Sequence, residues 1–225
     1  MYSYEESPPK YEFDPRTEAY KLLSLALLVS AVVVGTIVFF DAPEWLYILG
    51  TIGEVVIIIG LFIMALFRTQ ISETWATILL YAFAIFSSIT LGYMVKFVLA
   101  LADDGVYIVF YTFATAGIVV LSIWYVTYTQ KPDVRGLYKY VMILVIGFLI
   151  FSLIGIFIWS DSNLFHLIMS FFGAFIFAIY MYIDFARLER YEFTSPAMMA
   201  LWLFYDIIYF IKYLLQFFLA LSSDR

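Results

Sequence analysis

Long apolar stretches alternate with short polar connections along almost all of the 225-residue chain. Seven of these stretches are long enough to cross the hydrocarbon core of a bilayer, which is roughly 30 Å thick and takes about 20 helical residues. Lipid leaves a single segment no other way to satisfy its backbone, so each stretch is predicted to be an α-helix. The seven predicted helices are 21–40, 46–67, 76–98, 106–127, 140–159, 164–186 and 198–220.

The composition supports the same structural class. Apolar residues make up 65% of the chain and charged residues only 13%. A soluble domain of this size has no interior that could bury so much apolar surface, so we expect an all-α, polytopic membrane protein. The connections, such as 41–45 and 160–163, are short. Neighbouring helices should therefore run antiparallel and form one transmembrane domain over residues 21–225.

The first 20 residues differ from the rest because they are polar, acidic and contain proline. They lack a basic start followed by an apolar core and a small-residue cleavage site. Residues 1–20 are therefore predicted to be a disordered cytoplasmic tail and not a signal peptide. With a tail this short and no targeting signal, the sequence favours an integral protein of a prokaryotic cell membrane, with an internal eukaryotic membrane as the alternative.

Residue counts argue against several classes of function. The chain has no cysteine, which removes disulfides, thiolate catalysis and cysteine-ligated metals. It has one histidine, His166, so a histidine metal site or a Ser-His-Asp triad is not expected. The net charge of −6 argues against nucleic acid as a partner and leaves the lipid bilayer as the expected one.

Basic residues are distributed unequally between the two sides of the predicted bundle. Nine of the 12 fall in the tail and in the second, fourth and sixth connections, or beside them. Because cytoplasmic loops carry an excess of lysine and arginine, we expect the N-terminus in the cytoplasm and the C-terminus outside. The nine are Lys10, Arg16, Lys21, Arg68, Lys131, Arg135, Lys139, Arg187 and Arg190; the other three are Lys96, Lys212 and Arg225.

The connections on the predicted outer side are acidic. They contain Asp41, Glu44, Asp103, Asp104 and Asp161, with almost no compensating base. Such a face would raise the local concentration of cations. The same residues are also typical of an ordinary solvated loop rim, and the sequence leaves both interpretations open.

Two aspartates lie inside apolar helices near the end of the chain, Asp184 in the sixth and Asp206 in the seventh. A carboxylate at membrane depth is costly and usually marks an ion path, a proton relay or a catalytic site. Counted from the linker between the two helices, Asp184 is about six residues deep and Asp206 about nine, so their depths differ by about 5 Å. They can therefore meet, share a proton and titrate as a unit. The alternative is that each pairs separately, as Asp184 could with Arg187 one turn later.

A third acidic residue, Glu54, lies in the second predicted helix near glycines that permit close helix packing. It could be a station on an ion path. It could equally form a structural ion pair with Lys212, which lies at a similar depth from the outer side.

Three segments resemble the Bax inhibitor-1 family, the transmembrane Bax inhibitor motif proteins. They are FAIFSSITLGYMV in the third helix, FFGAFIFAIYMYIDFARL in the sixth and ALWLFYDIIYFIKYLLQFFLALSS in the seventh. The likeness extends over all seven spans, including Glu54 in LGTIGEVVIII, and leaves out the tail. It rests on the number of spans, the short loops and one aspartate in each of the last two helices.

The resemblance implies seven helices with the seventh in the middle, and a pH-sensitive calcium leak, not an enzyme. It implies that Asp184 and Asp206 act as pH sensor and gate and hold calcium transiently, and that Glu54 lies on the ion path. Calcium is then the transported ion, no cofactor is expected, and calcium and protons are the partners. Eukaryotic members are linked to suppression of cell death. Bacterial members carry a basic latch residue near the position of Ala65 here, so Arg68 and Arg187 are the candidate latch partners.

Three other classes of function share some of these sequence features. Nothing in the sequence excludes a non-conducting membrane scaffold that regulates partners, which is kept as the alternative to the leak. An intramembrane aspartyl protease also needs two membrane aspartates, but its Gly-x-Gly-Asp motif is missing, because MYI precedes Asp184 and LFY precedes Asp206. A retinal protein needs a lysine in the last helix, and Lys212 is there, but the third helix has no aspartate counter-ion.

Overall fold

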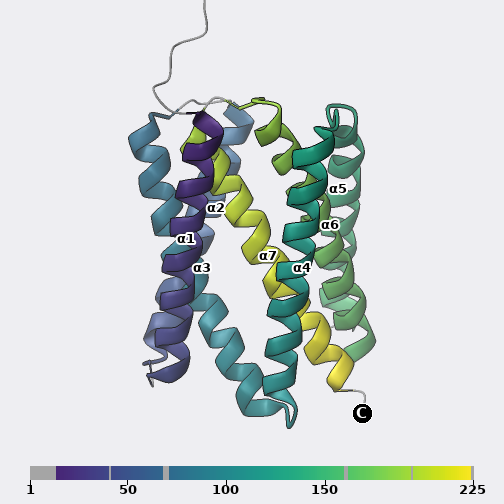
Figure 1. Ribbon diagram of the computed structural model, residues 1–225. Helices are drawn as coiled ribbons and strands as arrows, with labels where there is room; N and C mark the ends of the chain where they lie inside the picture. Colours follow the sequence, from purple (N-terminus) through teal and green to yellow (C-terminus); the bar gives the residue numbers. More distant parts are fainter. Residues whose placement is uncertain (1–13, 41, 68–70, 160–161, 194, 224–225) are drawn as a thin grey trace, which may run out of the picture.

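The computed structural model describes residues 14–40, 42–67, 71–159, 162–193 and 195–223. Within these residues the chain forms seven α-helices and no strand, which confirms the all-α prediction (Figure 1). The helices are α1 (Pro15–Phe39), α2 (Trp45–Phe67), α3 (Glu73–Leu101), α4 (Gly105–Gln130), α5 (Leu137–Trp159), α6 (Asn163–Glu189) and α7 (Pro196–Ser222).

The first helix begins earlier than the sequence pattern predicted. Asp14 is its N-cap: its side chain accepts a hydrogen bond from the backbone N–H of Arg16 at 3.0 Å, and Pro15 follows at the first helical position. Proline suits this position because its fixed φ matches a helix and its missing N–H would have no partner there. Residues 15–20 are therefore helical. The prediction of a disordered tail concerns, for residues 1–13, a part of the chain outside the described residues.

Serine residues mark the start of three other helices. In each case the serine hydroxyl accepts a hydrogen bond from the backbone N–H three residues later, as is typical of an N-cap. These serines are Ser72 before α3, Ser162 before α6 and Ser195 before α7.

Helix α7 runs through the middle of the bundle (Figure 1). It packs most extensively on α6 and also contacts α1, α3 and α4. Its buried residues lie on all sides of the helix, and they include Leu201, Leu203, Phe204, Ile208 and Leu215. The predicted central position of the last helix is therefore confirmed.

Helix α5 lies at the edge of the bundle, packed on α6. The other six helices are long and apolar enough to cross a membrane, whereas the described apolar part of α5, Lys139–Gly155, is shorter. The protein is thus an integral membrane protein with six to seven spans. We call the end of the bundle with the starts of α1, α3, α5 and α7 the basic end, and the opposite end the acidic end.

Candidate functional site

The structure brings Asp184 and Asp206 together on neighbouring helices. Asp184 lies in the last turns of α6 and Asp206 in the first half of α7, both toward the basic end. They are 7% and 4% exposed, and their carboxylates are close enough to interact electrostatically. Helices α6 and α7 form the most extensive helix pair of the bundle, so residues at a similar depth on the two helices lie near one another.

The two aspartates have different hydrogen-bond partners. Arg187 Nη1 donates to Asp184 Oδ1 at 3.1 Å, and the arginine side chain is 39% exposed. In contrast, Asp206 Oδ2 is buried and has no hydrogen-bond partner within the described part of the chain. A buried polar atom without a partner is costly, so this oxygen is the place in the site where a proton or a cation would be stabilised.

The residues flanking Asp206 in α7 are apolar or aromatic and tightly packed. The ring of Phe204 meets Phe83 of α3 edge-on at 6.0 Å, and the ring of Tyr205 lies 5.7 Å from Phe83. Phe83 and Phe204 are fully buried. Water is therefore kept away from this part of α7, which strengthens any electrostatic interaction of Asp206.

The second candidate latch residue, Arg68, lies outside the described residues. Ala65 belongs to α2, but its side chain is also outside them. Of the two predicted latch partners, Arg187 is thus the one whose contact with the aspartates is seen.

Glu54 forms a closed polar cluster with residues of α3 and α7. Lys212 Nζ donates to Glu54 Oε1 and to Thr90 Oγ1, the latter at 2.7 Å. Thr90 in turn donates to Glu54 Oε2 at 2.6 Å, and the hydroxyl of Tyr209 donates to Glu54 Oε1 at 2.7 Å. Of the two interpretations left open by the sequence, the ion pair with Lys212 is present.

Aromatic rings fill the space along α7 between the two acidic sites. Asp206 and Lys212 are six residues apart, which is about 9 Å along a helix. Tyr209 lies between them in the helix; its ring is 4.7 Å from that of Tyr205, and Phe177 of α6 stacks on it at 5.2 Å. The aspartate pair and the Glu54 cluster are therefore separated by packed side chains.

A groove opens at the acidic end between α2, α3 and α7. It has a volume of about 970 Å³, and its lining includes Tyr47, Met94, Lys96 and Gln216. Met94 and Gln216 lie one helical turn beyond Thr90 and Lys212. The groove therefore ends about one turn from the Glu54 cluster.

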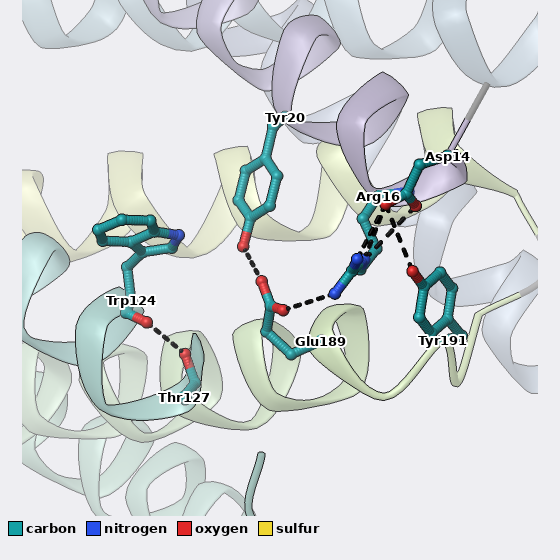
Figure 2. A network of polar contacts seen from close by, with 7 residues as sticks. All are labelled: Asp14, Arg16, Tyr20, Trp124, Thr127, Glu189 and Tyr191. Carbon is teal, nitrogen blue, oxygen red and sulfur yellow. Dashed lines mark hydrogen bonds and ion pairs between the residues drawn. The ribbon is translucent and has the colours of Figure 1, made fainter. Parts of the chain in front are cut away.

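A network at the basic end was not predicted from the sequence, because Arg16 and Tyr20 had been assigned to the tail (Figure 2). At its centre is Glu189, which is 2% exposed. Glu189 accepts hydrogen bonds from Arg16 Nη1 at 3.1 Å and from the hydroxyl of Tyr20 at 2.6 Å. Arg16 also lies 4.5 Å from the ring centre of Tyr191, and both residues donate to Asp14. The Asp-Pro pair at 14–15, a common helix start, was the signal that could have revealed it.

A second unpredicted contact holds the start of the central helix. Glu73, the first residue of α3, accepts hydrogen bonds from the hydroxyl of Ser195 and from the backbone N–H of Ala197 at 2.7 Å. A carboxylate at a helix N-terminus satisfies free N–H groups and complements the helix dipole. It also ties α7 to the connection that follows α2.

The described residues contain no group of three or more His, Cys, Asp or Glu side chains that could hold a metal ion. The predicted calcium site therefore rests on two carboxylates alone. Calcium prefers six to eight oxygen ligands, so water and carbonyl groups would have to supply the others, and binding would be weak.

The fold and its buried acidic residues define a polytopic, all-α membrane protein with ionisable side chains along its central helix. The sequence profile of the family described as "Inhibitor of apoptosis-promoting Bax1" (Bax1-I) matches residues 16–224, nearly the whole chain. The protein belongs to this Bax inhibitor-1 family. None of the curated proteins compared with the chain matches it significantly.

Proposed function

We propose that the protein is a pH-sensitive calcium leak of the kind found in bacterial members of its family, gated by Asp184 and Asp206. The observation that carries the proposal is a pair of buried carboxylates on adjacent helices, near enough to interact electrostatically, one of them with an oxygen that has no hydrogen-bond partner among the described residues. Intramembrane ionisable residues of this kind usually have a transport or sensing role.

The gating mechanism follows from the repulsion between the two carboxylates. When the pair carries a proton, one carboxyl group can donate a hydrogen bond to the other, and α6 and α7 stay together. When the proton is lost, the repulsion is relieved by a cation, by an arginine or by separation of the helices. Asp184 already has Arg187, so the loss of the proton acts chiefly on Asp206.

The proposed route for calcium begins at the acidic end. The groove between α2, α3 and α7 leads toward the Glu54 cluster, and acidic connections at that end attract cations. Because Lys212 neutralises Glu54, an ion can use this carboxylate only after the Glu54–Lys212 pair separates. We therefore assign Glu54 a place on the path that is closed in this structure.

Calcium flux into liposomes tests this proposal. Purified protein is reconstituted and flux is recorded between pH 5 and 8 for the wild type, for Asp206→Asn, and for Glu18→Gln as a partly exposed acidic control on α1 at the basic end, away from the proposed entrance. We expect a pH-dependent leak in the wild type and the control. In Asp206→Asn the response to pH should be lost, because the amide cannot exchange a proton in this range.

An unchanged pH profile in Asp206→Asn would exclude the aspartate pair as the gate. Absence of flux from the wild type at every pH would favour the second candidate, a non-conducting scaffold or stress regulator. The packed aromatic rings between Asp206 and Lys212 and the neutralised Glu54 support that candidate, because they leave this part of the bundle closed.

A further inference from the structure

A cleft at the basic end lies between the α4–α5 connection, the last turns of α6 and the linker to α7. It has a volume of about 340 Å³ and is lined by Val134, Arg135, Ile183, Arg187 and Glu192. This size is at the lower end of the range of ligand pockets, roughly 300–1,000 Å³. The cleft therefore suits a small group and not an extended ligand.

Two arginines from different elements line this cleft. Arg135 comes from the α4–α5 connection and is 71% exposed, and Arg187 comes from α6 and is 39% exposed. A guanidinium has five N–H donors. Within the described residues Asp184 is the acceptor that Arg187 contacts, through Nη1, so the other donors of Arg187 have no protein acceptor there.

The cleft already accommodates one anionic side chain. Glu192 Oε1 accepts hydrogen bonds from Arg135 at 2.8 Å and from Arg190 at 3.0 Å. These hydrogen bonds hold the pKa of Glu192 below its ordinary value. The two arginines of the cleft, Arg135 and Arg187, thus have the carboxylates of Glu192 and Asp184 as partners, and Asp133 lies beside Arg135, so an anionic ligand would have to compete with these carboxylates for the guanidinium groups.

We propose that this cleft binds the phosphate group of an anionic ester, with Arg135 and Arg187 as its donors. The planar fork of arginine matches the geometry of phosphate oxygens and can bind two of them at once. Val134 and Ile183 provide apolar walls for the carbon part of the ester. An anionic lipid headgroup and a soluble phosphate ester share this chemistry, and the experiment below separates them.

Arg187 connects the cleft to the aspartate pair. A phosphate that engages Arg187 competes with Asp184 for the same guanidinium, so the ligand and the Asp184–Arg187 ion pair should oppose each other. The binding itself does not rest on the proposed calcium leak. Only the effect of the ligand on gating rests on the proposed calcium leak. A protein that conducts no calcium could still bind the ligand.

Binding is measured with the full chain in detergent by isothermal titration. The probes are dioctanoyl-phosphatidylglycerol, dioctanoyl-phosphatidylcholine and glycerol 1-phosphate. The variants are Arg135→Gln and Lys139→Gln, the latter an exposed cation at the start of α5 that does not line the cleft. We expect phosphatidylglycerol to bind more tightly than phosphatidylcholine. Arg135→Gln should weaken binding about tenfold, as the loss of one charged hydrogen bond does, and Lys139→Gln should leave it unchanged.

The probes distinguish the sources of the phosphate. Binding of glycerol 1-phosphate that is sensitive to Arg135→Gln would show that the phosphate alone suffices. Sensitivity for phosphatidylglycerol but no binding of the soluble ester would show a lipid site. Equal loss in both variants, or no binding of either anionic probe, would overturn the proposal.

Asp184→Asn tests the part assigned to Arg187. The amide holds the arginine less strongly, so the arginine is freed for the ligand, and phosphatidylglycerol should bind several-fold more tightly than to the wild type. An unchanged affinity would remove Arg187 from the site. The comparison with Arg135→Gln remains informative in that case, because Arg135 has no contact with Asp184.

Discussion

At the scale of single residues, the aspartate pair is asymmetric. Asp184 has an arginine partner, and Asp206 has a buried oxygen that has no hydrogen-bond partner among the described residues. A buried, unpaired carboxyl oxygen lowers the stability of the folded protein. Its presence is therefore better explained by function than by stability. The two aspartates should therefore respond differently to the same substitution.

Asp206→Asn should stabilise the protein at pH 7.5, by about 1–2 kcal/mol, because it removes a buried charge that lacks a partner. Asp184→Asn should change stability by only about 0–1 kcal/mol, because the partner, Arg187, is partly exposed to solvent. Thermal unfolding in detergent measures both effects. At pH 5 the gain from Asp206→Asn should shrink, since a proton then does what the amide does. A lower melting temperature for Asp206→Asn at pH 7.5 would show that its charge is compensated.

The ionised residues outside the spans respond to pH in a different range. The pKa of Glu192 is lowered by hydrogen bonds from Arg135 and Arg190, and that of Asp14 by its hydrogen bonds with Arg16. A carboxyl group with a lowered pKa adds stability that is present above its ordinary pKa and is lost as the pH falls through the lowered value. For these two groups the loss begins below the ordinary values of 4.5 and 3.8. A response between pH 5 and 8 must therefore come from other groups.

At the scale of helices, buried polar contacts fix how the elements meet. Glu54, Thr90, Tyr209 and Lys212 join α2, α3 and α7, and Glu189 joins α1 to α6. Apolar side chains can pack in several arrangements within a lipid environment, whereas an ion pair has only one partner to find. These contacts set which helices are neighbours at each end of the bundle.

Lys212→Met should destabilise the protein by about 3–5 kcal/mol, because it leaves Glu54 buried without its cation. The double variant Lys212→Met with Glu54→Gln should recover most of that loss, since no unpaired charge remains. Unfolding in detergent of the two single variants and the double variant measures the coupling. Additive effects of the two substitutions would show that the Glu54–Lys212 pair has no structural role.

At the scale of the whole molecule, the arrangement depends on α7. It starts at the basic end, tied to Glu73, and ends at the acidic end after crossing the bundle (Figure 1). The start of α1 and the end of α7 thus lie at opposite ends. If all seven helices span the membrane, the two termini lie on opposite sides of it.

The absence of cysteine makes the orientation directly testable. Single substitutions Asp133→Cys in the α4–α5 connection and Ser223→Cys after α7 are expressed in cells and exposed to an impermeant maleimide. We expect labelling of Ser223→Cys in intact cells and of Asp133→Cys only after permeabilisation, because the connections of the basic end carry most of the lysine and arginine. The reverse pattern would place the basic end outside.

The sequence was most informative where the membrane itself constrains the residues, in the length of the apolar runs and the depth of the charged side chains. Apolar runs predicted all seven helices, since the bilayer sets their length. The depths of Asp184 and Asp206 placed both carboxylates toward the same end of the bundle, where they lie near enough to interact electrostatically. The prediction was wrong at the start of α1, because the helix begins at Pro15, several residues before the apolar run. Asp14 and Pro15 define that helix end through local hydrogen bonding, to which hydropathy is insensitive.

The sequence by itself determined the class of the protein, the number of helices and the residues that carry charge into the membrane, because these follow from the cost of exposing polar groups to lipid. Only the tertiary structure decided which charges meet. Glu54 pairs with Lys212 and Glu189 with Arg16, whereas Asp206 Oδ2 has no hydrogen-bond partner among the described residues. Those outcomes depend on how each helix is rotated and crossed by its neighbours, and many distant side chains share in setting that geometry.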